Sequence, residues 1–271
     1  DVTVTRLSET AYLVVTPAAT RLADETWLRR NLGSNIAVIT DVTAGEGVLA
    51  VMGPNARALL QAVSSNDFSN EANPFGTAQE IELGMGLARA HRVSYVGELG
   101  WEIYVSTDMA SHAFEALHAA GRPLGLKLCG MHTMDSCRIE KAFRHFGHDI
   151  TSEDNVVDAG LSFAVDLSKP DFIGKSAVAA RKESGPKARM VQFLLQDSQP
   201  LLYHNEPILR DGEIVGYLSS GGYGHTLGAA VGLGYVPSEG QSAAEVLDAE
   251  GWFKSGDVAV IDPDGFVRIV D

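Results

Sequence analysis

Cysteine is scarce in this chain of 271 residues, which contains only Cys129 and Cys137. A disulfide framework needs more cysteines than two, and a metal site needs tighter spacing than this pair has. Free thiols are the norm in reducing compartments. We therefore expect a cytoplasmic protein if the source is bacterial, or a mitochondrial matrix protein if it is eukaryotic.

Positive charge is also scarce, since 21 Lys and Arg residues face 35 Asp and Glu residues and give a net charge of −14. Nucleic-acid surfaces need clustered Lys and Arg to neutralise phosphates. Docking on anionic lipid needs the same clusters. The balance therefore argues against a nucleic-acid or membrane partner, while a few local cations remain able to hold an anionic ligand.

Long apolar runs are absent, and none approaches the ~20 residues that span a bilayer. The first residues, 1–5, have neither the basic nor the apolar stretch of a secretory signal. The G-x-G-x-x-G fingerprint of dinucleotide binding is missing as well. Apolar residues still make up 45%, as in a soluble protein with a substantial core.

The most informative segment runs from Ser94 to Tyr104. Gly97 and Gly100 bracket Glu98 in a turn that opens onto an alternating strand. Glycine accepts backbone angles that other residues resist and lets a ligand approach the main chain. A carboxylate held there beside aromatic side chains suits a flat heterocycle with N–H donors. A β-hairpin with a solvated Glu98 is the simpler alternative.

Periodicity predicts an α+β chain, with a β-only pattern after residue 188 that fits a small sandwich or barrel. The division that we expect is an α/β module at 1–90, an α+β module at 91–185 and a C-terminal β module at 186–271. The segment at 184–187 is the best candidate for a boundary. The predicted strands lie within 1–16 and at 36–41, 47–52, 78–83, 87–92, 124–129, 189–195, 207–210, 213–219 and 230–236, and the helices at 22–32, after 55, and at 108–120 and 132–143.

The turn resembles the Y-x-G-E-x-G-[YW]-E-[IV] signature of the aminomethyltransferase family. That family includes the T-protein of the glycine cleavage system and the folate domains of dimethylglycine and sarcosine dehydrogenases. Similar pieces follow the family's order over roughly residues 1–245, and the folate-binding C-terminal part of the dehydrogenases is the nearest branch. The resemblance implies a multi-module fold that binds tetrahydrofolate and ends in a C-terminal barrel. The supporting pieces lie at 1–4, 51–56, 135–140, 171–175 and 219–228.

The resemblance also implies roles for particular residues. Glu98 matches the glutamate that binds the pterin edge, and Tyr95 lies close enough in sequence to pack on the cofactor or hydrogen-bond to it. Asp1 matches the family's essential aspartate near the folate nitrogens, which makes it the candidate catalytic residue. A hydrated Asp1 and a core Tyr95 are the alternatives. Because the family's first strands precede the position of Asp1, we expect an exposed sheet edge and weak stability or self-association.

Two further candidates lie in the second half of the chain. Arg138 stands three residues after Asp135 on a predicted helix, so it can clamp a ligand carboxylate or form a structural ion pair. Tyr223, in a glycine-rich segment at 219–228, resembles a hairpin near the family's ligand opening. The spacing of His145 and His148 across Gly147 does not suit a metal site.

The tail from about residue 250 departs from the family. Residues 251–271 resemble a segment of acyl-adenylate-forming ligases, in which the residue matching Asp257 holds the nucleotide ribose. The phosphate loop and large N-terminal domain of those ligases are missing. We therefore interpret the tail as an atypical or chimeric end that completes a β-sheet.

Together these features predict a tetrahydrofolate-binding module that transfers a one-carbon unit from an amine-derived substrate. Any FAD would have to come from a further domain or a partner subunit. A non-catalytic folate-binding or assembly domain is the alternative, and a fragment of an adenylate-forming ligase is a weaker one.

Overall fold

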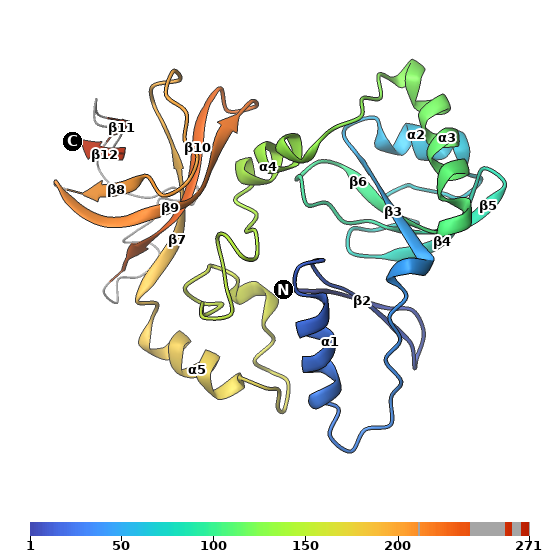
Figure 1. Cartoon of the computed structure of the whole chain (residues 1–271), viewed down its shortest axis with the longest axis horizontal. Coiled ribbons are helices and arrows are strands. Elements are labelled where there is room, and N and C mark those ends of the chain that lie inside the picture. Colours follow the sequence, from blue (N-terminus) through green and yellow to red (C-terminus); the bar gives the residue numbers. More distant parts are fainter. Residues whose placement is uncertain (211, 239–257, 262–266, 271) are drawn as a thin grey trace. The chain divides into compact units, whose positions relative to one another are not determined.

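The computed structural model describes residues 1–210, 212–238, 258–261 and 267–270 (Figure 1). Contacts divide the chain into two units, residues 1–128 and 129–271, and each is considered by itself. The three-module division at residues 90 and 185 stays a prediction. Mixed helices and sheets confirm the α+β class.

The first unit begins with a two-stranded antiparallel ribbon, in which Thr5 pairs with Leu13. A helix follows, and then a four-stranded antiparallel sheet with the order β3-β6-β5-β4. The elements are β1 (Thr3–Arg6), β2 (Tyr12–Val15), α1 (Arg21–Arg30), β3 (Glu46–Met52), α2 (Ala56–Val63), β4 (Ala78–Leu83), β5 (Gly86–His91), β6 (Gly100–Ser106) and α3 (Ala110–Gly121), with short 3-10 helices at Thr43–Gly45, Thr107–Met109 and Arg122–Leu124.

One face of this sheet forms the core of the unit. Trp101, Ile103 and Val105 of β6 point to the same side, as the two-residue period predicts, and each is almost fully buried. Leu60 of α2 and Leu117 of α3 belong to the same apolar cluster, and both helices lie along this face (Figure 1). The opposite face carries the polar residues of β5 and β6.

The first 50 residues contain no buried residue, in contrast to the sheet that follows. Val4 and Tyr12 of the ribbon and Trp27 of α1 are exposed by 58%, 57% and 52%. In the part of the chain that the structure describes, β1 and β2 pair only with each other. The exposed sheet edge that the sequence predicted is therefore present, and the expected weak stability stays a prediction.

The second unit is built on a six-stranded sheet with the order β11-β12-β8-β9-β10-β7. Apolar clusters cover both of its faces, one centred on Leu218 and Ala230 and the other on Ile139 and Leu233. The elements are α4 (Met131–Glu140), α5 (Lys175–Ser184), β7 (Ala188–Leu194), β8 (Pro207–Arg210), β9 (Glu213–Gly224), β10 (Ala229–Pro237), β11 (Val258–Ile261) and β12 (Val267–Val270), with a 3-10 helix at Ser162–Ala164.

Two strand predictions are wrong. Residues 36–41 form no strand, and Ile36 and Val38 are almost fully exposed. Leu124 ends a 3-10 helix and residues 125–129 form a loop with Leu128 exposed, because Leu126 donates its backbone N–H to Gly121 instead of to a strand. Apolar runs this short predict a strand only where a neighbouring strand can pair with them.

Truncating Ile103 tests the core of the first unit. Ile103→Ala should lower the free energy of unfolding by about 2–5 kcal/mol, because it leaves a cavity in a tightly packed cluster. Val48, which is 51% exposed on the neighbouring strand, provides the matched control. Val48→Ala should change the free energy of unfolding by no more than about 0.5 kcal/mol. Denaturant titrations followed by tryptophan fluorescence measure both variants. Equal losses in the two variants would contradict the assignment of the core face.

Candidate functional site

The turn that carries Glu98 lies between β5 and β6 in the first unit. Gly97 adopts a left-handed conformation with φ of 71°, which costs glycine little and strains other residues. A Cβ at Gly100 would lie 2.8 Å from the carbonyl oxygen of Val51, so only glycine fits beside β3 there. The backbone N–H of Gly53 donates to Leu99 at 2.8 Å and fixes the end of the turn. Glu98 is thus an exposed carboxylate on a tightly specified backbone.

The other two predicted residues of this unit differ in their surroundings. Tyr95 is partly buried on the same turn, three residues before Glu98. Asp1 is exposed and lies two residues before β1 begins. The structure brings Tyr95 and Glu98 together on one loop, and their roles stay predictions.

A buried histidine beside this turn was not singled out by the sequence. His91, at the end of β5, is 2% exposed, and its ring lies 4.4 Å from that of Tyr104. Its Nδ1 lies 3.4 Å from Oγ1 of Thr5 on β1, and Tyr104 donates a 2.7 Å hydrogen bond to Glu102. Burial and the nearby Arg89 lower the pKa of His91, and burial raises the pKa of Tyr104. The sequence shows only that His91 lies on the polar side of an alternating strand. The structure adds that it pairs with Glu102 across the sheet.

Arg138 lies in the second unit at the centre of a buried polar network. Its side chain is 4% exposed and donates to Asp149 at 2.6 Å, to Ser220 at 2.9 Å and to the carbonyl of Phe143 at 3.1 Å. Asp149 also accepts hydrogen bonds from Ser219 and from the backbone of His145. Arg138 is thus engaged in a buried ion pair with Asp149, a partner that the sequence did not indicate, and its role toward a ligand stays a prediction.

Tyr223 lies near the end of β9, in the tight glycine-rich hairpin that the sequence allowed. Its hydroxyl donates to the carbonyl of Gly228 at 2.9 Å, and its own carbonyl accepts from Ser136 of α4 at 2.6 Å. Glu140, also on α4, accepts a 2.7 Å hydrogen bond from the backbone of Thr226. The structure therefore brings Tyr223 and Arg138 together around α4.

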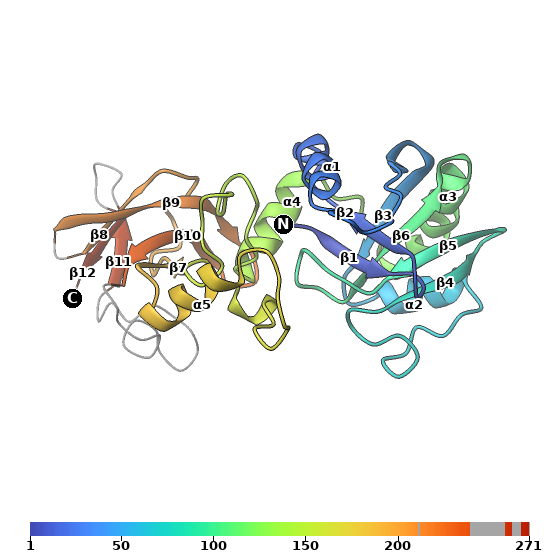
Figure 2. The ribbon, with the colours of Figure 1, turned by 90° about the horizontal axis from the view of Figure 1, so that it is seen from below.

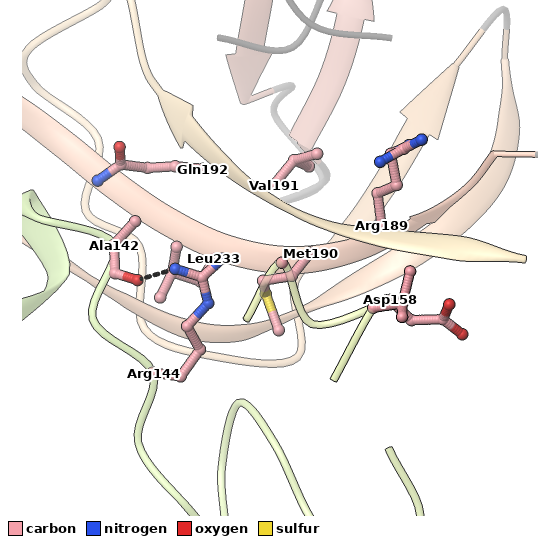
Figure 3. A pocket seen from close by; sticks show the side chains of 10 residues that line it. Ala142, Arg144, Asp158, Arg189, Met190, Val191, Gln192 and Leu233 are labelled. Atoms are coloured by element: carbon pink, nitrogen blue, oxygen red, sulfur yellow. Dashed lines mark hydrogen bonds between the residues drawn. The ribbon is translucent and has the colours of Figure 1, made fainter. Parts of the chain in front are cut away.

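A cavity of about 340 Å³ also lies in the second unit, beside β7 (Figure 3). Arg144, Asp158, Met190 and Gln192 are among the residues that line it. None of the five predicted site residues lines it, so it is separate from the site that the sequence predicted. Arg144 is fixed there by a hydrogen bond to the carbonyl of Ala142 at 2.6 Å.

Two other kinds of site are absent from the described residues. There, no group of three or more His, Cys, Asp or Glu side chains is arranged to hold a metal ion. In the same part of the chain, no helix has the length and apolar character needed to cross a membrane.

Comparison with known families identifies the fold. Residues 1–169 match the GCVT N-terminal domain, and residues 189–260 match the glycine cleavage T-protein C-terminal barrel domain. The chain belongs to the glycine cleavage T-protein family of aminomethyltransferases. The predicted family and its C-terminal barrel are confirmed, and the boundary candidate at 184–187 falls between the two matches.

Individual relatives include both short and long members of the family. The chain is 32% identical over 251 residues to an aminomethyltransferase of Shouchella clausii, covering 92% of this chain and 68% of that protein. It is 44% identical over 234 residues to a 4-methylaminobutanoate oxidase (formaldehyde-forming) of Paenarthrobacter nicotinovorans, covering 86% of this chain and 28% of the oxidase. Human mitochondrial dimethylglycine dehydrogenase is 32% identical over 253 residues, which cover 92% of this chain and 29% of the dehydrogenase. The chain thus spans about three-tenths of the length of these oxidase and dehydrogenase relatives.

A solved structure supports the same assignment. The aminomethyltransferase T of the glycine cleavage system from Bartonella henselae superimposes with a TM-score of 0.76 at 27% identity, covering 88% of this chain and 64% of that one.

The tail is only partly described. Asp257 and most of residues 251–271 lie outside the described residues, but β11 and β12 pair with each other and β12 pairs with β8. These strands complete a sheet, as the sequence predicted. Because the barrel domain matches as far as residue 260, the alternative of a ligase fragment is not supported.

Removing Asp149 tests the structural interpretation of Arg138. Asp149→Ala should cost about 3–5 kcal/mol in the free energy of unfolding, because it leaves a guanidinium buried without its counter-charge. Asp135 also contacts Arg138, at 3.2 Å, but its side chain is 44% exposed. Asp135→Ala should therefore cost no more than about 1 kcal/mol. Chemical denaturation measures both variants. Similar losses in the free energy of unfolding would show that the buried pair does not hold the second unit together.

Proposed function

We propose that this chain is a tetrahydrofolate-binding one-carbon transfer module of a larger amine-oxidising protein. The observation that carries the proposal is the exposed Glu98 carboxylate on a glycine-framed turn of a T-protein-family chain. The relatives named as a formaldehyde-forming oxidase and a dimethylglycine dehydrogenase support a one-carbon unit drawn from an N-methylated amine.

The turn fits the ligand chemically. The pterin edge presents amine and ring N–H donors, and an ionised carboxylate accepts such bonds through two oxygens. The glycine-framed turn fixes the backbone of Glu98 before the ligand arrives, so little further conformational entropy is lost on binding. Tyr95, on the same turn, is the residue that we propose packs against the ring.

The one-carbon transfer step requires few groups of the protein. Tetrahydrofolate supplies the nitrogens that take up the one-carbon unit. Asp1, as a carboxylate near those nitrogens, would steer a proton and stabilise positive charge on the incoming carbon. Holding the reactants together supplies much of the remaining rate enhancement.

The two candidates of the second unit contribute differently. Tyr223 remains a proposed cofactor contact, since the hydrogen bonds that hold its hairpin against α4 use the backbone carbonyl of Tyr223 and the backbone N–H of Thr226 rather than the tyrosine ring. Arg138 supports that hairpin through Ser220. Oxidation of the amine would fall to a flavin-containing domain or partner subunit, because the sequence has no dinucleotide fingerprint.

Replacing Glu98 tests the binding step. Glu98→Gln keeps the shape of the side chain but loses its charge, and should weaken tetrahydrofolate binding by about 10- to 100-fold, the value of a charge-assisted hydrogen bond. Glu80→Gln, an exposed change in the same sheet, should leave the affinity within about twofold. Titration calorimetry measures both. Unchanged affinity in Glu98→Gln would remove the basis of the proposal.

Replacing Asp1 separates catalysis from binding. Asp1→Asn in the whole protein should keep tetrahydrofolate affinity within about threefold and slow one-carbon transfer by about 10²-fold or more, as expected for loss of a general acid–base group. Transfer is measured as the tetrahydrofolate-dependent fall in free formaldehyde during oxidation of sarcosine, dimethylglycine or 4-methylaminobutanoate. Wild-type protein that binds tetrahydrofolate without capturing the carbon would favour the non-catalytic binding domain instead.

A further inference from the structure

His91 combines near-complete burial with contacts to two separate parts of the first unit. It ends β5 on the polar face of the four-stranded sheet, opposite the face that forms the core. A buried histidine normally has its ring nitrogens satisfied, because an unpaired polar group inside a protein is costly. Here Nδ1 has Thr5 as its partner, while Nε2 is buried without a hydrogen bond among the described residues.

The contact with Thr5 joins residues 86 positions apart in the chain. Thr5 belongs to β1, which otherwise pairs only with β2 in the described part of the unit. The hydrogen bond of 3.4 Å between Oγ1 and Nδ1 therefore ties the ribbon to the sheet. Figure 2 shows the ribbon of β1 and β2 alongside the strands of this sheet. Because the ribbon buries no residue of its own, such a specific contact has a large share in fixing where β1 lies.

The other side of His91 leads to the strand of the Glu98 signature. The imidazole lies against the ring of Tyr104 at 4.4 Å, and Tyr104 donates to Glu102 at 2.7 Å. His91 is also the direct cross-strand partner of Glu102. A continuous path of side-chain contacts thus runs from β1 to a carboxylate four residues after Glu98.

The direction of β1 connects this path to the proposed catalytic residue. In a strand, residues two apart point to the same side, so Thr3 and Thr5 share a face, and Asp1 lies two residues before this strand begins. Anchoring Thr5 on the sheet therefore fixes the register of the strand from which Asp1 extends. A shift of one residue would turn Thr3 and Thr5 to the other side of the strand and displace Asp1 with them.

We propose that His91 is a positioning residue, which acts through Thr5 to hold β1 and Asp1 over the sheet that carries the Glu98 turn. This inference rests on the proposed function. It assigns His91 no contact with the folate, because its side chain is buried beneath β1.

The protonation state of His91 belongs to this role. Neutral imidazole has a lone pair on one ring nitrogen, which can accept a hydrogen bond from a threonine hydroxyl. The groups that face it are Thr5, Tyr104, Glu102 and Arg89, and burial with the Arg89 charge lowers its pKa below the usual 6.5. The imidazole is therefore neutral at pH 7, and acid below pH 6.5 would progressively charge it and loosen β1.

Paired variants test the anchor in the whole protein. Thr5→Val keeps the shape of the side chain and removes the hydroxyl, and His91→Phe keeps the ring on Tyr104 and removes the nitrogens. Each should lower kcat of one-carbon transfer by about tenfold while tetrahydrofolate affinity stays within about threefold. The double variant should be no slower than either single variant, because both remove the same bond. Thr5→Ser, which restores the hydroxyl, should recover most of the rate.

Two further measurements test the anchor, one by amide exchange without turnover and one by the pH dependence of the rate. Amide hydrogen exchange of residues 1–6 should be faster in Thr5→Val than in wild type, and Thr5→Ser should restore it. The transfer rate of wild type should fall more steeply below pH 6.5 than that of His91→Phe. If His91→Phe fails to fold, Thr5→Val alone decides the question by its rate and its exchange.

The outcomes separate this inference from the proposed function. Wild-type kcat and wild-type exchange in Thr5→Val would overturn the positioning role, even where Glu98→Gln weakens tetrahydrofolate binding as expected. Additive losses in the double variant, or equal losses of affinity and rate, would overturn it too. Unchanged affinity in Glu98→Gln would instead overturn the proposed function, while the exchange measurement still reports on the anchor.

Discussion

The two-residue period of β6 is the constraint on which the first unit depends. It sends Trp101, Ile103 and Val105 into the core and leaves Glu102 and Tyr104 on the other face. One strand therefore fixes the apolar packing of α2 and α3 and the polar layer under β1 at the same time. The Glu98 turn begins directly before this strand, so a rigid sheet supports the residue that we propose binds the cofactor.

The second unit depends on a different interaction. The buried pair of Arg138 and Asp149 joins α4, the loop after it and the start of the glycine-rich hairpin. Such a pair is costly to bury and still more costly to break, so it favours one arrangement of these three segments. Glycines make the close approach possible: a Cβ at Gly221 would lie 2.6 Å from the backbone of Leu202.

Sequence reasoning succeeded where a local pattern coincided with long-range pairing. The strands at 78–83 and 100–106 and the helix that became α3 carried their own periodicity. It failed at 36–41 and 124–129, because an apolar run becomes a strand only if another strand accepts its hydrogen bonds. It missed α5, and it missed His91, because nothing near that residue in the sequence shows that Thr5 lies beside it.

The sequence by itself determined the family, the α+β class, the glycine-framed Glu98 turn and the alternation that follows it. All of these depend on residues within a few positions of one another, where backbone preference and side-chain period act directly. The tertiary structure decided that Arg138 is engaged in a buried ion pair, that Tyr223 lies in a hairpin held on α4, and that His91 joins β1 to β5. Those contacts link residues 11, 87 and 86 positions apart, and only the folded chain brings such distant groups within hydrogen-bonding range.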